Sequence, residues 1–463
     1  APSGRLASVY HIYGNDPGQP GAFNANYHPG YRSIGTSFEI YPGVIVPSDL
    51  APTQNGALIW NPTSNVSQLA ACKLEDTTPQ IYAVDRPYVQ DQGTITIRGL
   101  GFGVYDPVNT RSAVWLGSNR LGVVSWTDRQ IVATVNRNVP AGPQQLNVVA
   151  GNNETTVNGL TIHVLRQRVG QRPAYLPNLI EVGPDPAVHD YQTIQGALDA
   201  AAGYADPANP VAPQNSLVVV YPGATTPFTN PMGFWLENPI IYSPVKLQGI
   251  GPGGVYTDGT GVLGTILDGR GMGGTEVYAE WWRLLAGDIW LNRGGWDGSP
   301  ADGDGNPRLY EGQVLTVFAE DAEFTSAFYA SIDGFKIQGG DQQGFPNNIN
   351  QVGGGRIPGV PAEVVIQGGG IFVNGYARYL RITNNHIENN GGAYAGGIRL
   401  GTPDMAEPYT DHQNDSILIA KNRIVGNGGT NLAGAIGVFA GAQNYEIAGN
   451  DIYWMEALRG SGG

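Results

Sequence analysis

The sequence predicts an all-β chain in which a small sandwich is followed by a parallel β-helix, and three observations support this. Of 463 residues only 14% are charged, whereas 68 are glycine and 33 are proline, a composition typical of short strands joined by many turns. Short alternating strands recur between residues 79 and 166. Beyond them, segments rich in isoleucine and asparagine repeat along the chain, as in a stack of coils.

Residues 1–78 are predicted to form an extended segment that packs on the downstream part of the chain. Glycine, proline and asparagine interrupt it often, as in Asn15-Asp16-Pro17-Gly18, and no helical period is sustained. Strands are expected within it, for example at Ser37–Tyr41 and Ala57–Trp60. Its composition does not favour an independent domain.

Residues 79–166 carry short strands at regular spacing. Thr94–Arg98 alternates apolar and polar side chains with period two and runs into a glycine-rich turn. Further strands are predicted at Ala113–Leu116, Val123–Trp126, Ile131–Val135 and Gln145–Val149. Strands of this length, bounded by Gly, Asp, Asn or Pro, predict a small sandwich.

This part of the chain resembles the IPT/TIG immunoglobulin-like family. The resemblance is carried by Pro79 with Ile81, Gly93–Gly103, Ser125–Asp128 and Gly142–Val148. It implies an immunoglobulin-like β-sandwich over residues 79–166 that serves as a spacer or interaction module, and it implies no chemistry.

Residues 167–463 are predicted to begin with a short cap-like helix and to continue as a solenoid. The helix lies within Tyr191–Ala201, where Ile194, Leu198 and Ala201 share one face. Strands are predicted after it at Leu217–Tyr221, Val245–Gly249 and Thr265–Gly269.

The later part of this region repeats itself. Arg381–Gly392 aligns with Leu418–Gly429, a third copy is Glu446–Ile452, and Ser331–Ile337 is a degenerate earlier copy. Isoleucines at alternate positions are expected to point into a dry core. Asparagines at the bend, such as Asn385, Asn422 and Asn450, are expected to stack from coil to coil and to bond the turn backbone. The pattern predicts a parallel β-helix.

The region is similar to the pectate-lyase-like right-handed β-helix superfamily. Thr193–Ala201, Val219–Gly223 and Val245–Gly254 carry the resemblance. It implies a right-handed parallel β-helix and no particular activity, because this fold hosts lyases, hydrolases, epimerases, esterases and adhesins. A complete repeat is followed directly by Gly460–Gly463. Because an uncapped solenoid exposes its last coil, we expect further chain or another protein chain to cover this end.

An insertion between residues 272 and 312 offers two kinds of binding residue. Sugar rings stack on aromatic platforms, which makes Trp281, Trp282, Trp290 and Trp296 candidate substrate-binding residues; the alternative is a short helix whose apolar face packs on the solenoid. Ca²⁺ prefers oxygen ligands, which makes Asp297, Asp302, Asp304, Asn306 and Glu311 a candidate metal site. Pro307 stands where an EF-hand loop requires glycine, so only a looser calcium site or a plain polar turn fits.

A second insertion, residues 401–415, is the candidate catalytic site. Asp404, Glu407, Asp411 and His412 crowd into it, and crowded carboxylates can supply a general acid and a base. Arg399 and Lys421 on adjacent coils are candidate partners for an acidic sugar. A solvated acidic loop has the same composition. The motifs Asn-Thr-Asp, Gly-His-Gly and Arg-Ile-Lys of polygalacturonases and Asp-Pro-His of alginate epimerases are missing.

The net charge and the composition disfavour several classes of binding partner and site. With 25 basic and 39 acidic residues the net charge is −14, which disfavours nucleic acid as a partner. Apolar stretches fall short of the roughly 20 residues of a membrane helix. The single cysteine, Cys72, cannot form an internal disulfide, and the six histidines are dispersed. Of these, His386 is expected to be a solvated member of a coil.

The leading hypothesis is therefore a secreted or cell-surface scaffold that binds a carbohydrate or a protein partner and belongs to a larger protein or assembly. The chain begins Ala-Pro rather than with Met, which fits a cleaved signal peptide or a cut from a longer polypeptide. The alternatives are a polysaccharide lyase or glycoside hydrolase acting in the β-helix groove, and a structural piece of a large multicopper-oxidase-type secreted protein.

Overall fold

The computed structural model describes residues 78–90, 92–108, 111–167, 174–206, 210–269, 308–319, 322–340, 363–366, 369–373, 375–392, 395–401, 414–429, 433–439, 442–453 and 455–457. Within these ranges the chain is nearly all β, with one helix, so the predicted all-β class is confirmed. No helix in the same ranges is long and apolar enough to cross a membrane. The strands expected at Ser37–Tyr41 and Ala57–Trp60 lie outside the described residues.

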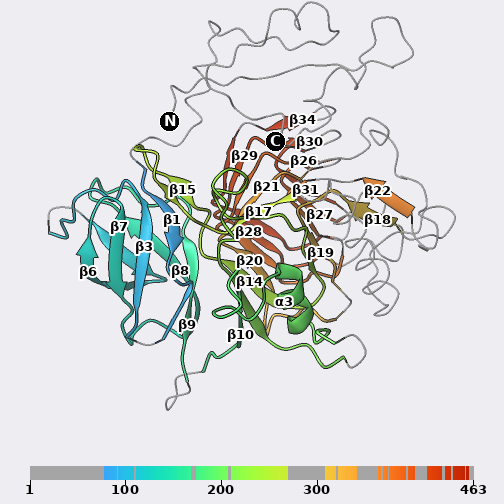
Figure 1. Ribbon diagram of the computed structural model, residues 1–463, viewed down its shortest axis with the longest axis horizontal. Helices are drawn as coiled ribbons and strands as arrows, with labels where there is room; N and C mark the ends of the chain where they lie inside the picture. The colour runs from blue at the N-terminus through green and yellow to red at the C-terminus, as the bar shows by residue number, and fades with distance from the viewer. Residues whose placement is uncertain are drawn as a thin grey trace, which may run out of the picture.

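Two mainly antiparallel sheets form a first layered unit, drawn in blue and cyan in Figure 1 and called the sandwich below. One sheet has the order β1-β3-β7-β6 and the other β2-β9-β8-β4-β5. Their strands are β1 (Gln80–Val84), β2 (Tyr88–Gln90), β3 (Thr94–Leu100), β4 (Ala113–Leu116), β5 (Asn119–Arg120), β6 (Gly122–Trp126), β7 (Gln130–Thr134), β8 (Gly142–Val149) and β9 (Leu160–Leu165). Period-two alternation places Ile95 and Ile97 of β3 in the interior with Ile131 of β7.

Three parallel sheets come next along the chain, called the stack below. The seven-stranded sheet contains β10 (Asn178–Val182), β11 (Ser216–Val220), β14 (Val245–Gly249), β20 (Ser331–Asp333), β24 (Arg381–Thr383), β28 (Leu418–Ala420) and β32 (Glu446–Ala448). The six-stranded sheet contains β12 (Phe234–Trp235), β17 (Ile266–Asp268), β21 (Lys336–Gln338), β25 (His386–Glu388), β29 (Arg423–Val425) and β33 (Asp451–Tyr453). The five-stranded sheet contains β13 (Ile240–Ile241), β19 (Leu315–Val317), β23 (Ile371–Val373), β27 (Ile398–Leu400) and β31 (Ile436–Val438).

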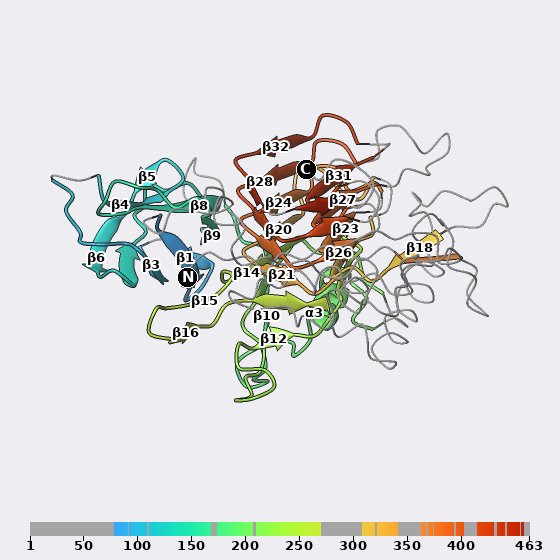
Figure 2. The same cartoon turned by 90° about the horizontal axis from the view of Figure 1, so that it is seen from above.

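Short elements complete the stack. They are β26 (Gly391–Gly392), β30 (Gly428–Gly429) and β34 (Glu456–Ala457) in a parallel sheet, the antiparallel pair β15 (Gly254–Val255) and β16 (Gly261–Val262), and the parallel pair β18 (Arg308–Glu311) and β22 (Glu363–Ile366). The circuits that begin at β24 and at β28 each add one strand to each sheet in the same order, and Figure 2 shows β20, β24, β28 and β32 as successive rungs. This arrangement fits a β-helix or another repeat fold.

Isoleucines fill the inside of the stack in vertical rows. Ile332, Ile382 and Ile419 are Cα partners on neighbouring strands of the seven-stranded sheet, and all three are fully buried. A second row, Ile337, Ile387 and Ile424, runs through the six-stranded sheet in the same way. The alternate isoleucines of the repeat therefore point inward, as predicted, because successive side chains of a strand face opposite sides of the sheet.

Asparagines form ladders at the turns between these sheets. The backbone N–H of Asn385 donates to Oδ1 of Asn422 at 3.0 Å, and the N–H of Asn422 donates to Oδ1 of Asn450 at 2.9 Å. The side-chain amide of Asn422 also donates to the carbonyl of Ile382 at 2.8 Å. Each asparagine thus bonds turn backbone that would otherwise be buried without partners. The predicted ladder is confirmed.

One helix closes the N-terminal end of the stack. It is α3 (Ile194–Ala201), which begins after Thr193, whose hydroxyl accepts from the N–H of Gly196. Ile194, Leu198 and Ala201 are buried against the strands, as the sequence pattern predicted. In Figure 2, α3 lies at the opposite end of the stack from β32.

Candidate functional site

The sandwich packs against the outer face of the seven-stranded sheet, and this junction has an apolar and a polar part. In β11 the side chains alternate, so Val218 and Val220 enter the core of the stack. Leu217 and Val219 point the other way and join the core of the sandwich. The uninterrupted apolar run of β11 is therefore explained by burial on both faces of the strand.

Asp333 of β20 is the centre of the polar part. Its carboxylate is 1% exposed and accepts five hydrogen bonds from side-chain and backbone donors. The donors are Thr161 N (3.0 Å), Thr161 Oγ1 (2.6 Å), Gln248 Nε2 (2.9 Å), Thr383 Oγ1 (2.6 Å) and Asn384 Nδ2 (2.7 Å). Thr161 belongs to the sandwich and the other three residues to the stack. The carboxylate thus ties the two units together through donors that satisfy its oxygens.

A buried histidine extends this network. Nε2 of His163 lies 3.1 Å from Oε1 of Gln248, and Nδ1 lies 2.8 Å from the Tyr175 hydroxyl. Because the Gln248 oxygen can only accept, Nε2 carries the proton and Nδ1 accepts from Tyr175. Burial lowers the pKa of His163 to about 3, and the nearby Lys246 contributes to the lowering. His163 is therefore neutral at ordinary pH.

Lys246 of β14 lies beside this network. Its Nζ donates to the carbonyl of Tyr329 at 2.6 Å and lies 3.4 Å from the centre of the Tyr329 ring. Burial, together with the charge of Arg381, lowers the pKa of Lys246 to about 7. An amine with this pKa can be uncharged in the folded protein near neutral pH.

The stability of the junction is expected to depend on pH through His163. Its pKa is about 3 in the folded chain and about 6.5 in an unfolded one. Between these values the unfolded chain binds more protons, so stability falls as pH is lowered from 6.5 toward 3. His163→Gln removes this titrating group, so its free energy of unfolding should fall less steeply with decreasing pH than that of the unmodified protein. The two slopes should differ by up to about 1.4 kcal/mol per pH unit, the value for one proton. Urea unfolding of both proteins at several pH values measures this, and parallel pH profiles would contradict it.

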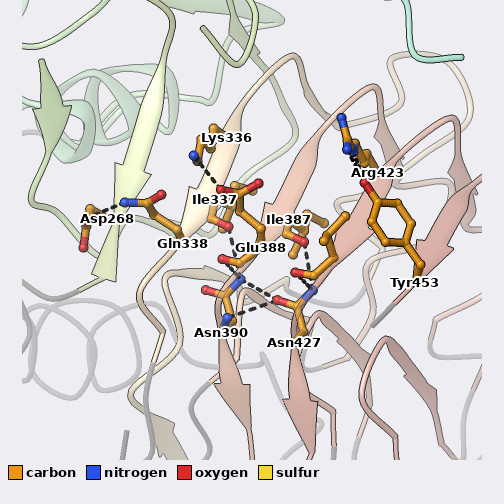
Figure 3. Close-up of polar contacts among 11 residues, drawn as sticks. Asp268, Lys336, Ile337, Gln338, Ile387, Glu388, Asn390, Arg423, Asn427 and Tyr453 are labelled. Carbon is orange, nitrogen blue, oxygen red and sulfur yellow. Dashed lines mark hydrogen bonds and ion pairs between the residues drawn. The ribbon is translucent and has the colours of Figure 1, made fainter. Parts of the chain in front are cut away.

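The outer face of the six-stranded sheet carries a row of ionisable side chains (Figure 3). Lys336, His386 and Arg423 are neighbours on adjacent strands, and Asp451 is the next residue in the row; Lys336, Glu388, Arg423 and Tyr453 are labelled in the figure. Nζ of Lys336 lies 2.5 Å from Oε1 of Glu388. Burial acts to raise the pKa of Glu388, but the Lys336 ammonium, together with smaller contributions from His386 and Arg423, holds that pKa below its usual value.

Arg423 and His386 complete this row. Nε of Arg423 donates to the Tyr453 hydroxyl at 2.6 Å, and the guanidinium also partners that hydroxyl through a second nitrogen. Burial lowers the pKa of His386 to about 3, helped by the Arg423 charge and opposed by Glu388. His386 was expected to be a solvated member of a coil, and it is only half-buried, lining a small hollow together with residues of the sandwich.

A small hollow separates the sandwich from this row. It is lined by Pro79, Gln80, Ile81, Val157, Asn158, His386 and Arg423, and its volume of about 10 Å³ is room for one water molecule. In the described part of the chain, Nδ2 of Asn158 is buried without a hydrogen-bond partner. The hollow is therefore polar enough to hold a bridging water but too small for a sugar.

Most of the predicted site residues lie outside the described residues. This holds for the catalytic candidates Asp404, Glu407, Asp411 and His412, the aromatic candidates Trp281, Trp282, Trp290 and Trp296, and the metal candidates Asp297, Asp302, Asp304 and Asn306. Glu311 ends strand β18, but its side chain is not among those described. Across the described ranges, no group of three or more His, Cys, Asp or Glu side chains could hold a metal ion.

Arg399 is the one predicted substrate-binding residue whose side chain is described. It is 1% exposed, and its Nε donates to the carbonyl of Gly401 at 2.8 Å. Its guanidinium carbon lies 5.0 Å from the centre of the Phe372 ring and 5.4 Å from that of Phe439. Lys421, the other candidate partner for an acidic sugar, occupies a left-handed turn position between β28 and β29. A role for either residue in binding an acidic sugar stays a prediction.

Sequence reasoning missed the junction network of Thr161, His163, Gln248 and Asp333. The carboxylate and its sandwich donor are 172 residues apart, and no short motif links them. The one available signal was the strand Val245–Gly249, in which two polar residues, Lys246 and Gln248, alternate with apolar ones.

Comparisons with known proteins give little further information. No family model matches the chain, and no curated protein matches it. Among solved structures, a gamma-CGTase from alkalophilic Bacillus clarkii is similar over 24% of this chain and 16% of that chain, with 21% identity and a TM-score of 0.18.

Proposed function

We propose that this chain is a secreted or cell-surface scaffold in which an immunoglobulin-like sandwich of the IPT/TIG kind is fused to a right-handed parallel β-helix of the pectate-lyase-like kind. Its role is to hold a binding surface for a carbohydrate or a protein partner at a fixed position within a larger protein or assembly. The repeated circuits, the asparagine ladder and the capping helix support the β-helix assignment.

The observation that carries the scaffold role is the buried junction between the two units. Domains in one chain move relative to each other unless their interface is extensive and well packed. Here Leu217 and Val219 of the stack belong to the core of the sandwich, and Asp333 bonds Thr161 across the boundary. A shared apolar core with a satisfied polar centre favours one rigid body over two tethered domains.

The ionisable residues on the outer sheet faces also favour a structural role. Lys336 is paired with Glu388, Arg423 with Tyr453, and Lys246 with the Tyr329 carbonyl. A catalytic acid or base must reach a substrate atom, whereas each of these side chains is engaged with its own chain. Among the described residues, these contacts favour a role for the three cationic side chains in stabilising the folded chain.

A panel of plant, algal and bacterial polysaccharides tests this proposal against the enzyme alternatives. Incubations with and without calcium are assayed for new reducing ends and for the ultraviolet absorbance of unsaturated products. We expect neither signal to rise above the level given by heat-unfolded protein. Cleavage that Asp411→Ala abolishes would overturn the scaffold proposal in favour of a lyase or hydrolase, and retention of a polysaccharide without cleavage would identify the ligand class.

A further inference from the structure

The junction between the sandwich and the stack buries two titratable nitrogens, one from each unit. His163 of β9 is 1% exposed and Lys246 of β14 is 2% exposed. Nε2 of His163 lies 3.1 Å from Oε1 of Gln248, on the same strand as Lys246. The charge of Lys246 acts on the imidazole, so protonation of both groups would place two like charges near each other inside the junction.

Lys246 lies among neutral and positive groups in the described part of the chain. Its neighbours on the adjacent strands of the sheet are Leu217 and Ser331, and its Nζ donates to the neutral carbonyl of Tyr329 at 2.6 Å. Arg381 stacks on the same tyrosine, with its guanidinium carbon 3.8 Å from the ring centre. A buried ammonium without an opposite charge beside it is unfavourable.

The carboxylates around this pair have partners of their own. Neutral donors occupy the oxygens of Asp333; they are Thr161, Gln248, Thr383 and Asn384. On the neighbouring strand β2, the Tyr88 hydroxyl donates to Glu181 at 2.9 Å, and Glu181 also accepts from Tyr221 at 2.6 Å. The remaining polar neighbour of His163 is Tyr175, whose hydroxyl lies 2.8 Å from Nδ1. Protons added to the two nitrogens would therefore meet no free carboxylate among these groups.

We propose that the junction is a proton-sensitive closure: when His163 and Lys246 are protonated, the sandwich separates from the outer face of the seven-stranded sheet while both units stay folded. Separation lets water solvate the two cations, and it exposes Leu217 and Val219, which belong to the core of the sandwich when the junction is closed. The stack has a core of its own on the inner face of the sheet. The inference rests on the junction that carries the proposed function and adds a means of controlling it.

The direction of the pH dependence follows from the two groups. Burial, together with the charge of Arg381, lowers the pKa of Lys246 to about 7, against about 10.4 in an open junction. Burial lowers the pKa of His163 to about 3, against about 6.5 in an open junction. Between each pair of values the open form binds more protons, so closure weakens as pH is lowered. From about pH 8 to about pH 5 the two groups together should raise the ratio of open to closed molecules roughly a hundredfold.

Hydrogen exchange read by mass spectrometry measures this opening. The N–H of Thr161 donates to Asp333 across the junction at 3.0 Å, so it exchanges when the junction opens. Strands β3 and β24 lie inside their own sheets, with a neighbour on each side, so their amides exchange when a unit unfolds. After correction for intrinsic exchange rates, protection of Thr161 should fall roughly a hundredfold from about pH 8 to about pH 5, and protection of β3 and β24 much less.

Two variants and a control assign the effect to the two nitrogens. Lys246→Met and His163→Gln each remove one titrating group, so in each the pH-dependent fall in Thr161 protection should become about tenfold smaller. His189→Gln removes a histidine outside these contacts, whose Nδ1 lies 3.1 Å from the Asp185 carbonyl, and should leave the fall unchanged.

The outcomes separate this inference from the proposed function. Protection of Thr161 that stays constant with pH, that falls equally with β3 and β24, or that is unaffected by both variants would overturn the inference and leave the rigid scaffold standing. Absence of protection at Thr161 already at about pH 8 would show a junction that is open throughout, and would overturn both.

Discussion

Asp333→Ala is expected to destabilise the folded chain by about 3 kcal/mol or more. The substitution removes an acceptor for five hydrogen bonds and leaves donors on Thr161, Gln248 and Thr383 in a buried place. A buried donor without a partner costs its full desolvation, and bonds to a charged acceptor are stronger than average. Urea unfolding followed by circular dichroism and by tryptophan fluorescence measures the loss.

Asp258→Ala is the matched control for this prediction. Asp258 also accepts from a partner on the other unit, Arg129 at 2.6 Å, but both side chains are largely exposed. Exposed ion pairs contribute little, so the free energy of unfolding should stay nearly unchanged. If the two alanine variants were equally stable, the buried junction would not stabilise the molecule as described.

Asn422→Ala in the middle of the ladder is expected to cost about 3 kcal/mol. Asn422 is fully buried, and its side chain accepts from Asn385 and donates to the carbonyl of Ile382 and to Asn450. Alanine leaves groups of the rungs on both sides without partners. The free energy of unfolding from urea titration measures the effect.

Asn450→Ala, at the last rung, provides the comparison for the ladder. It removes the same residue type from the corresponding turn of the last described rung. Because Asn450 is only partly buried, water is expected to enter the space that its side chain leaves and to bond the groups of Asn422 and Ile419 that lose their partner. A loss of about 1 kcal/mol is expected, clearly smaller than for Asn422→Ala. Equal losses at the two positions would mean that the ladder does not stabilise the stack through burial.

The sequence predicts the repeating part of the fold well because that part depends on local pattern. The strand Val245–Gly249, the helix face of Ile194, Leu198 and Ala201, and the asparagine ladder all follow from spacing within a few residues. Neighbouring rungs have the same sequence pattern. The positions that are buried within one repeat therefore also make the contacts to the next repeat.

The junction could not be predicted in the same way. Whether the outer face of β20 is covered by solvent or by the sandwich depends on how two segments far apart in the sequence pack together. No local sequence pattern near Asp333 or His386 predicts this packing. His386 stands at an alternating polar position of a strand, where solvent exposure is the ordinary outcome. Only the contact with the sandwich places it against the hollow lined by Pro79 and Asn158.

The central claim is that the sandwich and the stack form one rigid body, and a spin-label distance measurement tests it most directly. Labels are attached to cysteines introduced at Val124 of the sandwich and Tyr445 of the stack, which are 64% and 45% exposed, with Cys72 replaced by serine. Pulsed electron paramagnetic resonance should give one narrow distance distribution for this pair. A broad distribution or several separate distances would show that the two units move independently and would contradict the claim.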